Sequence, residues 1–92
     1  AGKCTAAICA APAIVLKAHG LLPASFTHFP APPLKEKTGA GYSESLVVVD
    51  GCVVTSQGPG TALPFGLKLV ELLVSREKAE EVAKGLLNTE VP

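Results

Sequence analysis

Cys9 is the side chain best placed for covalent chemistry. It follows a short apolar run over residues 5–8 and precedes Ala10-Ala11-Pro12, where a helix can begin because proline is favoured in a first helical turn. A strand, a tight turn and a helix start would place the sulfur near unpaired backbone N–H groups, which stabilise an anion together with the helix dipole. The thiolate is the nucleophilic form of cysteine, so the pattern predicts a nucleophile at residue 9.

The neighbours of Cys9 fit a nucleophile elbow, the strained turn that presents a nucleophile between a strand and a helix. Ala7 and Ala11 are small, as a crowded turn requires, and the amide of Ala10 is a natural donor to an oxyanion. The alternative from the pattern alone is a structural cysteine that acts as a small apolar side chain. The other two cysteines, Cys4 and Cys52, lack this context, and we expect them to be structural or incidental.

Two histidines and a glycine-rich segment could contribute to a site. His28 falls in an expected short strand, 25–29, and the pattern alone favours a partly exposed surface histidine; because successive strand residues face opposite sides, it can point away from Cys9. His19 ends an expected two-turn, buried helix, 12–19, where a cation is favoured. Gly-Pro-Gly at 58–60 lacks the residues of a phosphate loop or a dinucleotide fingerprint, which favours a simple turn into a helix.

The remaining elements alternate between strands and helices. Two β-branched runs, 46–49 and 52–55, flank Asp50-Gly51, which predicts a hairpin whose two turn residues both have positive φ. A largely buried helix is expected over 61–74, and an amphipathic helix over 76–87. Three finer predictions concern a helical turn at 34–37, a helix cap at Thr61 and an ion pair between Glu80 and Lys84.

Composition limits the classes of function. The chain has 92 residues, of which 48% are hydrophobic and 17% charged, and this balance predicts one small folded domain. Eight basic side chains balance eight acidic ones, and no apolar run approaches the roughly 18 residues that span a bilayer, so we expect neither nucleic acid nor membrane as a partner. Three cysteines without a CxxC pair argue against a zinc site or a disulfide framework and favour a reducing, cytoplasmic location.

The apolar inventory exceeds what so short a chain can bury. About four strands and three helices are expected, and the helices are apolar on most of their faces. A free monomer of this composition would expose a large apolar patch. We therefore expect a missing segment, a second chain or an oligomer.

Three motifs, taken together, resemble the ThiJ/PfpI superfamily, and within it the branch of the parkinsonism-associated deglycase and its bacterial relatives. They lie at 6–12 (AAICAAP), 53–62 (VVTSQGPGTA) and 65–67 (FGL), in matching order. The resemblance implies a flavodoxin-like α/β sandwich, usually a homodimer, of which residues 1–92 supply the C-terminal half. It also implies that the absent N-terminal half provides most of the parallel sheet, a glutamate that hydrogen-bonds the cysteine and a second oxyanion amide.

The resemblance further implies a cofactor-free enzyme that acts on small reactive carbonyls, a glutathione-independent glyoxalase or protein deglycase. Cys9 would be the nucleophile, and the pocket would be walled by Gly58, Pro59 and Gly60. Two departures from the family pattern bear on the site. The branch often carries a histidine near the cysteine, directly before the proline at position 30, where this chain has Phe29. His28 stands one place earlier, and the resemblance makes it a candidate catalytic residue. Pro64 replaces an acidic residue that is common in relatives.

Two other functions belong to the same superfamily. A redox-sensing or chaperone-like protein would use Cys9 as a thiol that is oxidised to a sulfinate. A peptidase would need a histidine immediately after the cysteine. Ala10 stands there instead, which disfavours the peptidase.

Overall fold

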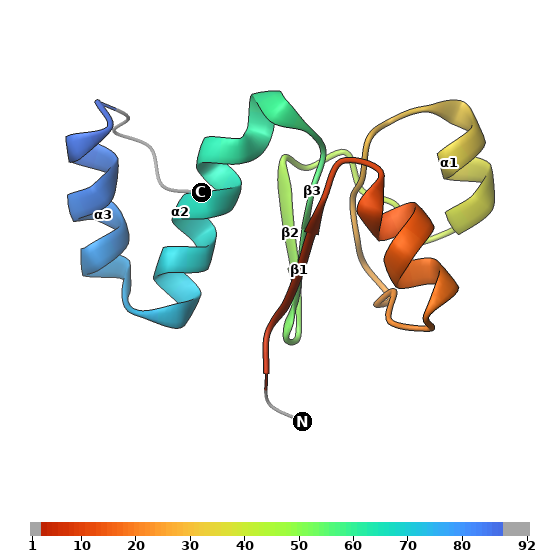
Figure 1. The fold of residues 1–92 in the computed structure, drawn as a ribbon, viewed down its shortest axis with the longest axis horizontal. Coiled ribbons are helices and arrows are strands. Elements are labelled where there is room, and N and C mark those ends of the chain that lie inside the picture. The colour runs from red at the N-terminus through yellow and green to blue at the C-terminus, as the bar shows by residue number, and fades with distance from the viewer. Residues whose placement is uncertain (1–2, 88–92) are drawn as a thin grey trace.

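A three-stranded mixed sheet lies at the centre of the computed structural model, which describes residues 3–87 (Figure 1). Its strands are β1 (Thr5–Ile8), β2 (Val47–Asp50) and β3 (Val53–Ser56), in the order β1-β3-β2. β1 runs parallel to β3 with Ile8 opposite Ser56, and β2 runs antiparallel to β3. Because β1 and β3 end side by side, the residues that follow them leave the sheet at the same edge.

Helical elements cover both faces of this sheet. In Figure 1, η1 (Pro12–Leu16) and α1 (Pro32–Thr38) lie on one side, whereas α2 (Ala62–Leu73) and α3 (Arg76–Gly85) lie on the other. The short 3-10 helix η2 (Pro59–Thr61) leads from the sheet into α2. The predicted helices are therefore present, although η1 has π-type geometry over five residues and α1 is longer than one turn. No helix within residues 3–87 is both long enough and apolar enough to cross a membrane.

The predicted hairpin is confirmed, but its turn differs from the expected one. β2 ends at Asp50 and β3 begins at Val53, so the two loop residues are Gly51 and Cys52. Gly51 has φ 60°, whereas Cys52 does not have a positive φ. A glycine in the first loop position is the requirement of a type II′ turn, which needs only one residue in the left-handed region.

The expected strand at 25–29 is wrong. The segment makes only an isolated bridge, between Phe26 and Tyr42, because its backbone groups bond to separate partners instead of to one strand. The N–H of Phe26 donates to the Gly41 carbonyl at 3.1 Å, and the N–H of Thr27 donates to the Thr55 hydroxyl at 2.9 Å. Gly41 is required at this crossing, since a Cβ there would lie 2.3 Å from the carbonyl oxygen of residue 24 at φ 104°.

The expected surplus of apolar surface is confirmed. Ile14 and Val15 of η1 are about half exposed, with fractions of 48% and 50%. A wider set of apolar side chains is exposed by 43% to 68%: Leu21, Leu46, Leu63, Leu72, Leu73 and Val74. The expected burial of the helices at 12–19 and 61–74 is therefore only partly correct. Their inner faces contact the sheet, and α3 packs against α2 and α1 against η1, yet the described residues leave the apolar side chains named above exposed.

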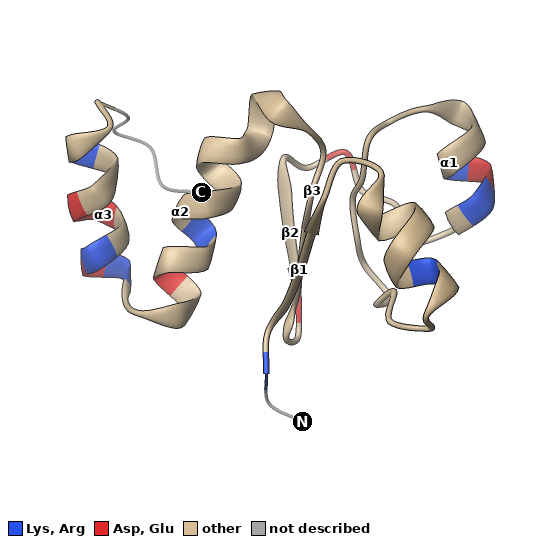
Figure 2. Ribbon diagram, viewed as in Figure 1, with Lys and Arg blue, Asp and Glu red and all other residues tan. Residues whose placement is uncertain are grey.

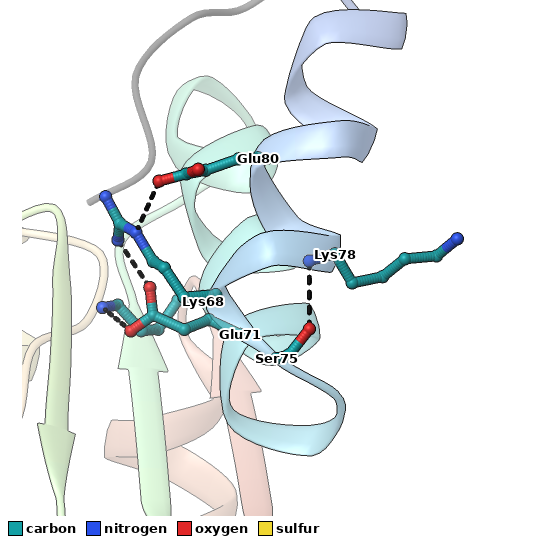
Figure 3. A network of polar contacts seen from close by, with 6 residues as sticks. Lys68, Glu71, Ser75, Lys78 and Glu80 are labelled. Carbon is teal, nitrogen blue, oxygen red and sulfur yellow. Dashed lines mark hydrogen bonds and ion pairs between the residues drawn. The ribbon is translucent and has the colours of Figure 1, made fainter.

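Charged groups lie mainly on the helices, where the two signs are mixed (Figure 2). Between α2 and α3, Glu71 accepts hydrogen bonds from Lys68 at 3.1 Å and from Arg76 (Figure 3). Arg76 also pairs with Glu80 at 3.3 Å, so the predicted pair of Glu80 with Lys84 is wrong. The hydrogen bond from Arg76, followed by that from Lys68, holds the pKa of Glu71 below its ordinary value of 4.5.

Replacing Glu71 tests this network through its pH dependence. A carboxyl whose pKa is lowered by folding stabilises the fold above its unfolded pKa, and this contribution is lost as the pH falls through the folded pKa. We expect Glu71→Gln to lower the melting temperature of the complete protein at pH 7, and the difference to shrink as the pH falls below 4.5. Glu36→Gln is the control, since the Glu36 carboxylate forms no ion pair with any described residue. A difference independent of pH would contradict the assignment.

Candidate functional site

Cys9 has a strained backbone at the junction of β1 and η1. Its φ is 65°, and Leu87 is the only other non-glycine residue in the described chain with a positive φ. The left-handed conformation costs an L-residue roughly 1–2 kcal/mol, and such strain is concentrated at functional sites. The thiol is free and partly exposed. The predicted tight turn between a strand and a helix is therefore confirmed at this residue.

Two hydrogen bonds from distant segments hold the Cys9 backbone. Its N–H donates to the carbonyl oxygen of Ser56 at the end of β3, at 3.2 Å. Its carbonyl oxygen accepts the N–H of Phe29 at 2.7 Å. The next amide, that of Ala10, donates to no described residue, as expected for an N–H at the start of a helix. The Ala10 N–H, which the sequence predicts to bind an oxyanion, is thus next to Cys9 and bonds to no described residue.

The Gly-Pro-Gly segment at 58–60 leaves the sheet beside Cys9, because β1 and β3 end together. Phe29 lies between the two. Its ring comes within 3.7 Å of the position that a Cβ on Gly58 would occupy, and its N–H bonds to Cys9. The sequence interpretation missed this role of Phe29, since a phenylalanine before a proline carries no signal for it.

The hydroxyl groups of Ser56 and Thr61 lie in contact and hold the Gly-Pro-Gly segment at 58–60 in place. The Ser56 hydroxyl lies 2.6 Å from the Leu46 carbonyl oxygen and 2.6 Å from the Thr61 hydroxyl. The Thr61 hydroxyl also lies 3.0 Å from the Gly58 carbonyl oxygen, so two hydroxyl protons are shared among three contacts. The Thr61 oxygen accepts the N–H groups of Gln57 at 3.2 Å and Gly58 at 3.1 Å. Thr61 therefore fastens the loop, and its oxygen accepts no N–H of α2, so the predicted side-chain cap of that helix is wrong.

His28 is fully buried, which differs from the partly exposed position expected as an alternative. Its Nδ1 lies 2.8 Å from the carbonyl oxygen of Phe29, and its Nε2 lies 2.9 Å from the hydroxyl of Thr38 in α1. The rings of Phe26 and Tyr42 pack against it, with centroids at 5.9 Å and 4.7 Å. Both ring nitrogens are thus engaged by residues other than Cys9.

The remaining candidates lie apart from this site. Cys4 and Cys52 are exposed free thiols at the opposite end of β1 and β3 from Cys9. His19 is exposed near the end of the first helical segment. Residues 3–87 contain no group of three histidine, cysteine or acidic side chains that could hold a metal ion.

An α/β sheet with a cysteine at a strained strand-to-helix junction defines the class of protein. Residues 1–72 match the family model of the DJ-1/PfpI family, and the chain belongs to that family. It is 47% identical to protein dj-1beta of Drosophila melanogaster and 40% identical to the glutathione-independent glyoxalase DJR-1.2 of Caenorhabditis elegans, over 94% and 92% of its own length. The solved structure of oxidized Toxoplasma gondii DJ-1 superimposes over 97% of the chain with a TM-score of 0.88 and 41% identity. The fold is therefore flavodoxin-like α/β.

The chain spans just under half the length of these relatives. It covers 46% of each of the two curated proteins and 48% of the Toxoplasma gondii chain. This coverage agrees with the apolar faces that the described residues leave uncovered.

Replacing Thr61 tests whether its hydroxyl holds the segment at 58–60 in place. Thr61→Val keeps the side-chain shape but removes the acceptor of two N–H groups, that of Gly58 buried and that of Gln57 partly buried, at a cost of roughly 1–3 kcal/mol. We expect Thr61→Val to lower the denaturation midpoint of the complete protein with an unchanged m-value. Thr61→Ser is the matched control because it retains the hydroxyl, and equal losses in the two variants would show that the hydroxyl does not carry the effect.

Proposed function

We propose that the complete protein containing this chain is a cofactor-free enzyme that acts on small reactive carbonyls, with Cys9 as its nucleophile. The observation that carries the proposal is the left-handed backbone of Cys9 at a strand-to-helix junction. Membership of a family that includes a glutathione-independent glyoxalase supports the reaction class. Protein deglycation would follow from the same adduct chemistry.

The reaction needs no external electron carrier. The Cys9 thiolate adds to the aldehyde carbon of a dicarbonyl such as methylglyoxal and forms a hemithioacetal. A proton then moves from the former aldehyde carbon to the neighbouring carbon, which oxidises the first by two electrons and reduces the second by two. Water hydrolyses the resulting thioester to a hydroxy acid and releases the thiol. The Ala10 amide would stabilise the oxyanion at the carbon under attack.

The proton transfers require a general acid–base group. Both nitrogens of His28 are engaged elsewhere, so we assign this task to a carboxylate outside the chain. The family resemblance places such a glutamate in the N-terminal half of the domain. Gly58, Pro59 and Gly60 would wall the pocket on the side of β3.

Cys9→Ser tests the nucleophile. We expect dicarbonyl turnover, measured as hydroxy acid formed from methylglyoxal, to fall at least about a thousandfold, because a hydroxyl is not ionised at neutral pH. Cys52→Ser is the matched control, since Cys52 is an exposed thiol in the hairpin turn. Retained turnover in the Cys9 variant would sink the proposal.

We further assign the uncovered apolar surface to the rest of the same domain, carried on a preceding segment or a separate chain, in a protein that forms homodimers. The free edge of β1 and the half-exposed Ile14 and Val15 support this assignment, as does the coverage of the relatives.

This assignment is tested by comparing the 92-residue chain alone with the chain supplied with the other half. We expect the chain alone to bind a hydrophobic dye and to aggregate, because its apolar faces have no cover. Adding the other half should give a soluble species of about twice the mass or a multiple of it. An active, folded sample that contains only the 9.4 kDa chain would refute the assignment.

A redox sensor is the second candidate. Cys9 is partly exposed at a helix start, and one relative of known structure is described as oxidized. Peroxide titration with mass mapping separates the two functions. Selective sulfinate at Cys9 without dicarbonyl turnover would favour the sensor.

A further inference from the structure

His28 is connected to the backbone of Cys9 through Phe29. The ring Nδ1 lies 2.8 Å from the Phe29 carbonyl oxygen, and the Phe29 N–H donates to the Cys9 carbonyl oxygen at 2.7 Å. The Cys9 carbonyl and the Ala10 N–H belong to one planar peptide group and point in opposite directions. A contact that fixes the carbonyl therefore also fixes the direction of the Ala10 N–H.

We propose that His28 is a positioning residue. Through Phe29 it orients the peptide group between Cys9 and Ala10, and it exchanges no proton with the substrate. This role differs from the direct catalytic role expected from the sequence. The inference rests on the proposed function only for its effect on turnover, because the hydrogen-bond chain exists independently of any activity.

The surroundings of His28 determine its tautomer. A carbonyl oxygen can only accept, so the bond to Phe29 requires a proton on Nδ1. In the neutral ring, Nε2 can then only accept, and the Thr38 hydroxyl can donate to it at 2.9 Å or to the Leu34 carbonyl oxygen at 3.1 Å. Phe26 and Tyr42 pack on the ring and restrict its rotation. No nitrogen is left to reach the thiol.

The hydrogen bond from His28 Nδ1 orients the Phe29 backbone, but it is not the only bond that the Phe29 carbonyl oxygen accepts. The Phe29 carbonyl oxygen also accepts the N–H of Ala31 at 2.8 Å, so it keeps one partner when the histidine is removed. The loss of His28 Nδ1 thus frees the Phe29 backbone without leaving its oxygen unpaired. Turnover should consequently respond more than stability does.

Substituting His28 by asparagine or by glutamine tests the two ring nitrogens, Nδ1 and Nε2, one at a time. In His28→Asn the side-chain amide can occupy the place of Nδ1 and still donate to Phe29, whereas in His28→Gln it can occupy the place of Nε2 and bond only to Thr38. Thr38→Val is the control for His28→Asn, because both lose the contact at Nε2; Thr38→Val also removes the contact of its hydroxyl with the Leu34 carbonyl oxygen, at 3.1 Å. All variants are made in the complete protein and assayed with methylglyoxal.

We expect His28→Gln to lower kcat about tenfold at an unchanged KM, since a misdirected oxyanion donor weakens only transition-state binding. His28→Asn should stay within about threefold of the unmodified protein, and Thr38→Val should lose less than His28→Gln. Equal losses in His28→Asn and His28→Gln would overturn the proposal, as would unchanged kcat in His28→Gln.

Nitrogen-15 NMR of the unmodified protein gives a second test that needs neither a variant nor turnover. We expect His28 to show the tautomer protonated at Nδ1 and Phe29 to show a slowly exchanging amide. A ring protonated only at Nε2 would overturn the proposal. This measurement keeps the two inferences apart, because an inactive protein with the expected tautomer would contradict the proposed function alone.

Discussion

The backbone of Cys9 is held in a conformation that it would not adopt by itself. An L-residue in the left-handed region loses roughly 1–2 kcal/mol, so the surrounding structure must supply compensating contacts. β3 provides one through Ser56, and the segment before Pro30 provides the other through Phe29. The elbow therefore exists only where two segments far away in the sequence meet the end of β1.

Buried polar groups near this elbow form a connected framework. The Ser56 and Thr61 hydroxyls contact each other, and the Thr61 oxygen accepts two backbone N–H groups. His28 joins Thr38 to Phe29. In a region of low dielectric such bonds are strong, and an unpaired member is costly. The site is thus surrounded by groups whose positions are mutually determined, which suits a nucleophile that must keep one geometry.

A second property of the chain is the apolar surface that its described residues leave exposed. The sheet has three described strands with helices on both faces, yet Ile14, Val15, Leu63 and Leu72 keep about half of their surface exposed. The relatives are about twice as long, and the exposed apolar faces indicate where additional chain would pack. The composition already predicted this exposed apolar surface, because the number of apolar residues can be counted without knowing how the helices and strands pack.

Local patterns in the sequence determined the β1–Cys9–helix junction, the hairpin, the amphipathic α3 and the family, because Pro12, Gly51 and the motif at 6–12 act through their immediate neighbours. Tertiary structure decided the rest. Segment 25–29 is not a strand, since its N–H groups donate hydrogen bonds to three separate residues, Gly41, Thr55 and Cys9. Glu80 pairs with Arg76, whose guanidinium also pairs with the Glu71 carboxylate of α2. His28 became buried and Phe29 became part of the site for one physical reason: hydrogen bonds between distant segments depend on how the chain packs, which no local spacing encodes.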